Sequence, residues 1–185
     1  IERALHLATS GEHIGVLTDP PALADALELL RLSQADVLFE NTPVNYHSGE
    51  PALSHLRTAL GLGMHAITAN KGPVVHGYAE LTALAAQHGR KFYFESAVMD
   101  GAPIFSLFRQ ALPAAELKAF YGILNSTTNL ILGRMEAGES LEQAIAYSQS
   151  IGIAETDPSG DVDGWDAAVK VAALVTVLMG IPLKP

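Results

Sequence analysis

The chain has 185 residues, of which 49% are hydrophobic and 17% are charged, enough for the core of one large or two small domains. Acidic residues outnumber basic ones by 20 to 11, giving a formal charge of -9 without a Lys/Arg run, which argues against binding to nucleic acid or an anionic membrane. The absence of cysteine excludes disulfides, thiolate zinc sites and a cysteine nucleophile. With no apolar run of transmembrane length and no signal-peptide pattern, we expect a cytoplasmic protein with a small-molecule partner.

The first half of the chain alternates short apolar runs with segments of helical periodicity. Helical spacing occurs at 1–11, 21–32, 49–63 and 73–89, and strand-like apolar runs occur at 35–42, 65–72 and 91–96. The last of these helical segments has proline at its first position and glycine at its end, as helices often do. The alternation predicts βαβ units in a parallel, doubly wound sheet with helices on both faces.

The pattern changes from Ala97 onward. A glycine-containing loop leads into helical segments at 104–112, 125–138 and 140–152, and a run of β-forming residues covers 117–124. The predicted fold class is therefore α/β, with a doubly wound, Rossmann-like domain over 1–95 followed by an α+β domain over 96–185.

Polar residues follow two of the predicted strands. ENTP contains Thr42, and TANKG contains Asn70 and Lys71. In open α/β sheets, ligands bind outside the carboxyl ends of the strands, so Lys71 could receive a phosphate or carboxylate there. The alternative is that these residues only form turns and that Lys71 is solvated.

The segment GILNSTTN places Asn125, Ser126, Thr127 and Thr128 where a helix begins. Unpaired N–H groups at a helix N-terminus suit an anionic ligand, whereas the alternative is simple N-capping.

The segment AETDPSGDVDGWDAAVK carries five acids before one lysine. An EF-hand register fails, because its first ligand would be Ser159 and its twelfth, which should be glutamate, would be Lys170. The spacing therefore excludes this type of calcium loop.

Lys170 begins a stretch that is apolar all the way round, which indicates a buried helix. If Asp163 caps this helix, Asp166 lies at its third position and Lys170 one turn later on the same face. The two could be only a capping acid and a surface lysine. A partly buried lysine among carboxylates also suits acid–base catalysis. Nearby carboxylates favour the ammonium form, which would donate a proton to a carbonyl oxygen as the carbon accepts hydride.

The ordered motifs TANKG, GAPI, GILNSTTN and GIAETDPSGDVDGWDAAVK closely resemble homoserine dehydrogenases from about Asp36 to Pro185. The resemblance implies an NAD- or NADP-dependent oxidoreductase that interconverts L-homoserine and L-aspartate 4-semialdehyde, on the route to threonine and methionine. It implies a nucleotide-binding domain over 1–95 without its glycine-rich first βαβ unit, and a substrate-binding, catalytic and dimerisation domain over 96–185. A homodimer is expected.

The resemblance also implies roles for individual residues. Lys170 matches the family's proton donor and acceptor. The predicted sites are Lys170, Asp166 and Lys71 for catalysis, Glu155, Asp161, Asn125 and Thr127 for the substrate, and Thr42, Asn70, Lys71 and Gly152 for the cofactor. A monovalent cation, usually sodium, is expected on the loop that contains Glu95, Val98, Asp100 and Ala102.

The chain departs from the family pattern at several places. It contains no G-x-G-x-x-G motif, Ser126 stands where the family commonly has glycine, and Met99 and Asp100 interrupt a run of small residues in the cation loop. Two alternatives therefore remain: a dehydrogenase of another hydroxy acid, and a non-catalytic homologue that has lost cofactor binding.

Overall fold

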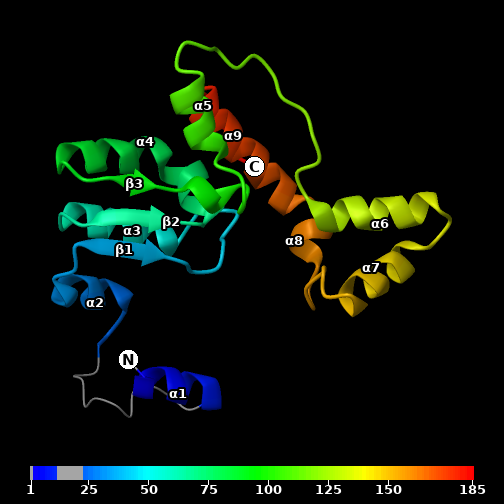
Figure 1. The fold of residues 1–185 in the computed structure, drawn as a ribbon, viewed down its shortest axis with the longest axis horizontal. Coiled ribbons are helices and arrows are strands. Elements are labelled where there is room, and N and C mark those ends of the chain that lie inside the picture. Colours follow the sequence, from blue (N-terminus) through cyan, green and yellow to red (C-terminus); the bar gives the residue numbers. More distant parts are fainter. Residues whose placement is uncertain (1, 12–22) are drawn as a thin grey trace.

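The computed structural model describes residues 2–11 and 23–185 (Figure 1). The α-helices are α1 (Glu2–Ser10), α2 (Ala26–Ser33), α3 (Ala52–Gly61), α4 (Lys71–Gln87), α5 (Ile104–Ala111), α6 (Ser126–Glu136), α7 (Leu141–Ser150), α8 (Ser159–Val162) and α9 (Trp165–Leu178). The strands are β1 (Val37–Glu40), β2 (His65–Thr68) and β3 (Phe92–Tyr93), and a 3-10 turn follows at Glu95–Ala97. The alternation predicted for the first half is confirmed, although residues 21–22 of the first expected internal helix lie outside the described residues.

The three strands form a parallel sheet in the order β1-β2-β3. The register pairs Glu40 with Thr68, so the last residues of β1 and β2 are neighbours. Because all the strands run in the same direction, the loops that follow β1 and β2 leave the sheet at the same edge (Figure 1). Parallel pairing thus brings together two loops that contain predicted site residues.

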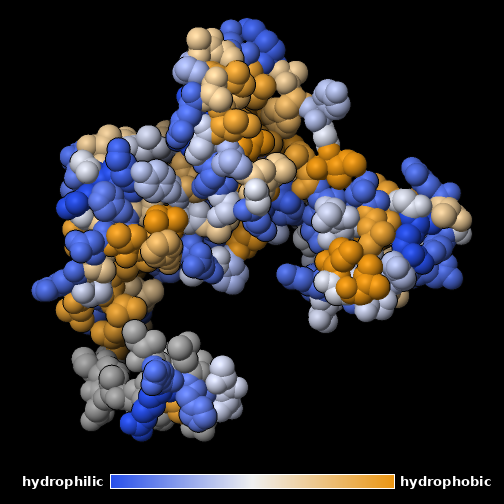
Figure 2. Space-filling view, in the orientation of Figure 1, coloured by the Kyte–Doolittle hydropathy of each residue, from blue (hydrophilic) through white to orange (hydrophobic). Residues whose placement is uncertain are grey.

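Helices α3 and α4 cover one face of this sheet. Leu56 and Leu60 of α3 and Leu81 of α4 are fully buried and pack with Ala66 of β2. In the described residues the other face carries exposed aromatic side chains, including Phe39 at 66% exposure. Figure 2 shows an apolar patch over β1 and β2. The helices of the described chain therefore cover one face of the sheet, and the prediction of helices on both faces is wrong for these residues, because the exposed side chains of β1 and β3 meet no helix there.

The second half is organised around α9, which has no exposed residue between its ends. Its buried residues Val169, Ala172 and Ala173 join Val74 and Phe105 in one core cluster, so the prediction of a buried last helix is confirmed. The hairpin of α6 and α7 lies away from the sheet, and an extended segment arches from α5 to α6 (Figure 1). Among the described residues, none of the helices has both the length and the hydropathy to cross a bilayer.

The predicted β-rich run at 117–124 is not a strand in the structure. Within the described chain this segment is extended but joins no sheet, and Tyr121 and Ile123 are exposed. A strand requires a hydrogen-bonded neighbour, so residue preference alone does not create one.

Two predicted helix starts differ from the observed ones. Asn70 caps α4, with its Oδ1 accepting from the Gly72 N–H, so this helix begins two residues before Pro73. Gly164, with φ of 83°, precedes α9, whereas Asp163 ends the short helix α8. Asp166 is therefore the second residue of α9, but the four-residue spacing to Lys170 is unchanged.

The start of α4 packs backbone to backbone against the loop after β1. A Cβ added at Gly72 would lie 2.9 Å from Gly49 Cα and 3.1 Å from Asn45 O. We expect Gly72→Ala to lower the free energy of unfolding by about 1–3 kcal/mol, the usual cost of overpacking. The matched change Gly133→Ala, in α6 with nothing within 4 Å, should raise it by about 0.5–1 kcal/mol. Urea denaturation of both variants checks this, and equal effects would contradict the close approach.

Candidate active site

A buried polar network joins the ends of β1 and β2. Glu40 Oε1 accepts from the backbone N–H and the hydroxyl of Thr42 at 2.7 and 2.5 Å, and its Oε2 accepts from the Thr68 hydroxyl at 2.7 Å. The Asn70 N–H donates to Thr68 Oγ1 at 2.9 Å, and Asn70 Nδ2 donates to the Thr42 carbonyl at 3.1 Å. Two of the four predicted cofactor residues, Thr42 and Asn70, therefore belong to one hydrogen-bonded unit.

Two lysines from different parts of the chain meet at Asp166. Lys71 at the start of α4 places Nζ 3.3 Å from Asp166 Oδ1, and Lys170 places Nζ 2.7 Å from Oδ2. Lys170 Nζ also donates to the Leu124 carbonyl at 2.8 Å. The lysine side chains are only 20% and 18% exposed. The three predicted catalytic residues thus form one charged cluster, and Lys170 is not a solvated surface lysine.

Asn125 connects this cluster to the acidic segment. Its Oδ1 accepts from the Thr128 N–H at 2.8 Å and so caps α6, which confirms the capping alternative. Its Nδ2 donates to Asp161 at 2.6 Å and to Asp166 at 2.9 Å. One amide therefore starts a helix and holds two predicted site carboxylates together.

The environment of Asp166 favours its charged form. Burial acts to raise the pKa of this carboxyl, but the hydrogen bonds from Lys170 and Asn125 and the positive charges of Lys71 and Lys170 lower the pKa below its ordinary value. Hydrogen bonds and cations that favour the carboxylate outweigh desolvation here. Asp166 is thus an anion that neutralises and orients two cations.

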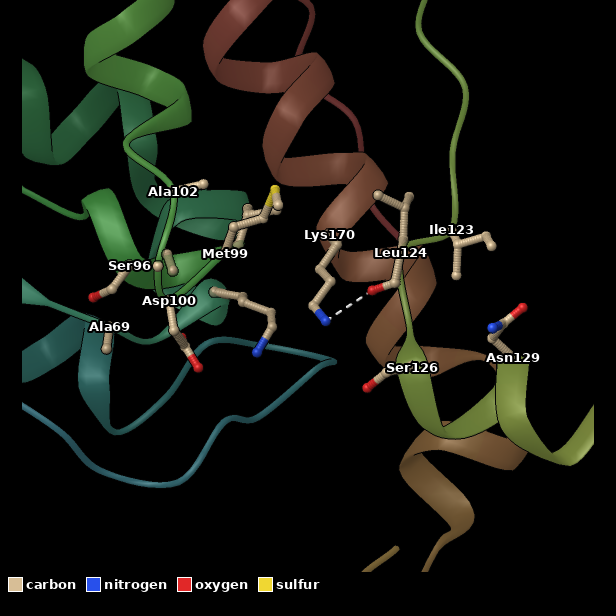
Figure 3. A pocket seen from close by; sticks show the side chains of 14 residues that line it. Ala69, Ser96, Met99, Asp100, Ala102, Ile123, Leu124, Ser126, Asn129 and Lys170 are labelled. Atoms are coloured by element: carbon tan, nitrogen blue, oxygen red, sulfur yellow. Dashed lines mark hydrogen bonds between the residues drawn. The ribbon is translucent and has the colours of Figure 1, made fainter. Parts of the chain in front are cut away.

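A cavity of about 510 Å³ opens beside the lysines. Figure 3 shows Lys170 with its amino group toward the Leu124 carbonyl, and Ser126 and Asn129 on the wall formed by α6. Residues of the loop after β3 form the opposite wall, Asp100 among them (Figure 3). Its volume is typical of sites for small ligands, and its walls come from both predicted domains.

Three other predicted site residues belong neither to the charged cluster around Asp166 nor to the buried network around Glu40. Glu155 is exposed in the loop after α7, and Gly152, with φ of 74°, is exposed at the end of α7. Thr127 is buried in the first turn of α6. None of the three lines the cavity.

The residues predicted to hold a cation lie along the loop between β3 and α5. Val98, Asp100 and Ala102 line the cavity. The Glu95 carboxylate accepts from the N–H groups of Phe105 and Ser106 at 2.8 and 3.1 Å and thereby caps α5. In the described parts of the chain, no three His, Asp or Glu side chains are gathered as metal ligands. A cation here would therefore need backbone carbonyls among its ligands.

Two features of the site were not predicted. Glu40 is only 2% exposed, and its position as the one acid at the end of an apolar run could have identified it. Tyr46 stacks on Trp165 with ring centroids 6.3 Å apart. Burial raises the pKa of Tyr46, and the carboxylates of Asp166, Asp161 and Glu155 raise it further. Nothing in the local pattern indicates that Tyr46 meets the acidic segment.

Comparison with known families gives two matches along the chain. Residues 9–95 match the family model described as "Homoserine dehydrogenase, NAD binding domain", and residues 103–185 match the model described as "Homoserine dehydrogenase". Together the matches span most of the chain, and residues 96–102, between β3 and α5, separate them.

Individual relatives agree with these matches. The chain is 40% identical over 166 residues to the NAD(+)-dependent homoserine dehydrogenase of Pseudomonas canavaninivorans, covering 89% of this chain and 47% of that protein. It is 39% identical over 157 residues to a homoserine dehydrogenase of Methanocaldococcus jannaschii, covering 84% and 47%. A hyperthermophilic archaeal homoserine dehydrogenase mutant in complex with NADPH superposes with a TM-score of 0.84 at 33% identity, covering 97% of this chain and 55% of that one. The chain thus spans about half the length of the relatives that it matches.

Proposed function

This chain belongs to the homoserine dehydrogenase family, and on that premise we propose that the full-length protein oxidises L-homoserine to L-aspartate 4-semialdehyde, and catalyses the reverse, with NAD or NADP. The observation that carries the proposal is the Lys71–Asp166–Lys170 cluster beside a cavity of small-ligand size. The cluster combines a proton carrier with a carboxylate that holds it in place.

Lys170 transfers the proton in this proposal. Its Nζ donates to Asp166 and to the Leu124 carbonyl, and an ammonium group has three donors, so one remains for a substrate oxygen. In the reducing direction Lys170 gives this proton to the C4 oxygen of the semialdehyde, and in the oxidising direction it takes the proton back from the C4 hydroxyl. The lysine therefore balances the charge that a carbonyl gains when it accepts hydride.

The remaining charges are proposed to orient the amino acid. Asp161, held by Asn125, and the exposed Glu155 would accept hydrogen bonds from the substrate ammonium. Lys71 would attract the substrate carboxylate while it stays paired with Asp166. Thr127 completes the proposed substrate site from the first turn of α6.

Cofactor binding is proposed at the shared edge of β1 and β2. The oxygens of Thr42 and Asn70 and the ammonium of Lys71 lie where open α/β sheets bind nucleotides, so the residues present fit such a ligand, with Gly152 proposed as a further contact. When bound, the nicotinamide ring accepts or supplies the hydride. A monovalent cation on the carbonyls of Glu95, Val98, Asp100 and Ala102, a homodimer and a cytoplasmic location also remain parts of the proposal.

Assays of the full-length protein test the function. We expect L-homoserine-dependent reduction of NADP or NAD, and little turnover with other hydroxy acids of similar size. No activity from a folded protein that still binds the cofactor would overturn the assignment of substrate.

A second substrate is favoured by one observation. Ser126, which stands where the family commonly has glycine, lines the cavity (Figure 3). If another hydroxy acid is the substrate, Ser126→Gly should shift the ratio of kcat/KM values toward L-homoserine. An unchanged ratio would remove the reason for this alternative.

A further inference from the structure

Glu40 is a buried carboxylate that has no role in the proposed reaction and that packing of the fold does not require. It is 2% exposed, and its oxygens accept from two hydroxyls and one backbone N–H. Its hydrogen-bond partners in the described chain are neutral groups from Thr42 and Thr68. Burying a charge is costly, and an apolar side chain of similar size is often at least as stabilising. Packing alone would therefore favour an apolar side chain over this carboxylate at the end of β1.

The contacts of Glu40 reach both loops at the edge of the sheet. On one side Glu40 fixes Thr42 through its N–H and its hydroxyl. On the other side the Thr68 hydroxyl donates to Glu40 and accepts from the Asn70 N–H, and Asn70 caps the helix whose first residue is Lys71. One carboxylate is thus linked to a proposed cofactor residue directly and to a proposed catalytic lysine through two neighbours.

We propose that Glu40 is a positioning residue of the active site. Its hydrogen bonds fix the loops after β1 and β2 relative to each other, so that Thr42 and Lys71 lie where the proposed reaction needs them. The proposal rests on the function proposed above. Thr42 donates to one oxygen of the carboxylate and Thr68 donates to the other, so Glu40 accepts hydrogen bonds from both loops. Because an amide offers an acceptor on one side only, glutamine cannot replace it without leaving a donor unpaired.

The first test is Glu40→Gln in the full-length protein. We expect kcat/KM for L-homoserine to fall about tenfold, as when a hydrogen bond to a charged group is lost. The primary deuterium isotope effect on the transferred hydride should increase, because a misaligned site makes this step slower relative to the others. The control is Glu80→Gln, which removes an exposed carboxylate bonded to Arg57 and should change neither value.

A second pair of variants leaves the buried charge in place. Thr68→Val keeps the shape of the side chain but removes the hydroxyl between Glu40 and Asn70, so it should reproduce the effects of Glu40→Gln. Thr68→Ser restores the hydroxyl and should recover most of the activity. In the double variant the two losses should not add, because they break the same link.

The outcomes separate this inference from the proposed function. An inactive wild-type protein would refute the function. If the wild type is active and Glu40→Gln behaves normally, the positioning role alone is refuted. The same holds if the variants lose activity only in proportion to the amount of folded protein, with KM and the isotope effect unchanged. If Glu40→Gln does not fold, Thr68→Val against Thr68→Ser decides the matter, since equal isotope effects in those two would overturn the inference.

Discussion

Lys170→Ala is expected to reduce the turnover of L-homoserine by about 10² to 10⁴, the usual range for loss of a general acid or base. The side chain bridges Asp166 and the Leu124 carbonyl next to the cavity, and no other amino group makes both contacts in the described chain. Lys71, whose Nζ is 3.3 Å from the other oxygen of Asp166, also lines the cavity, but its proposed role is to attract the substrate carboxylate. Steady-state kinetics at saturating cofactor measure the loss.

Two comparisons show whether the loss comes from chemistry. Lys170→Met keeps an unbranched aliphatic side chain at this half-buried position of α9. It should lose as much activity as the alanine variant, while circular dichroism and cofactor affinity stay close to those of wild type. Lys118→Ala removes a lysine that is 75% exposed and should leave turnover unchanged. Normal turnover in a folded Lys170→Ala protein would show that another group carries the proton.

Asp166→Asn should be the next most damaging change, with a loss of about 100-fold in kcat/KM, as expected when a catalytic group is displaced by about 1 Å. Asparagine has almost the same shape but no charge, so two ammonium groups would face each other without a counter-ion. Asn125 would also present its amide to a second amide in place of a carboxylate. The matched change Asp163→Asn, at an exposed position of the same acidic segment, should cost less than twofold.

The effect of Asp166→Asn on stability has a predicted dependence on pH. The pKa of Asp166 is lowered in the folded protein, so its contribution to stability is complete above the unfolded value of about pH 4. That contribution is lost as the pH falls through the lower pKa of the folded state. Urea denaturation at several pH values should show the largest difference between wild type and Asp166→Asn near neutrality and a smaller one in acid. A difference that grows in acid would contradict the ion-pair assignment.

Local periodicity predicted the elements of the fold well where it was strong. The strand expected at 35–42 is β1, and the last helix, apolar on all sides beyond Lys170, is buried or half-buried along its length. The run at 117–124 was predicted wrongly, because its β-forming residues meet no partner strand in the described chain. Strand formation is decided by the neighbour, and a single segment carries no information about which neighbour is present.

The sequence by itself determined the spacing of Asp166 and Lys170. Residues four apart on a helix lie on one face whatever surrounds them, and the apolar residues beyond Lys170 already indicated burial. The tertiary structure alone decided that Lys71 meets the same carboxylate, that Asn125 joins Asp161 to it, and that Glu40 lies between Thr42 and Thr68. These contacts depend on how the parallel sheet and α9 pack together, and packing between distant segments leaves no repeat in the sequence from which it could be predicted.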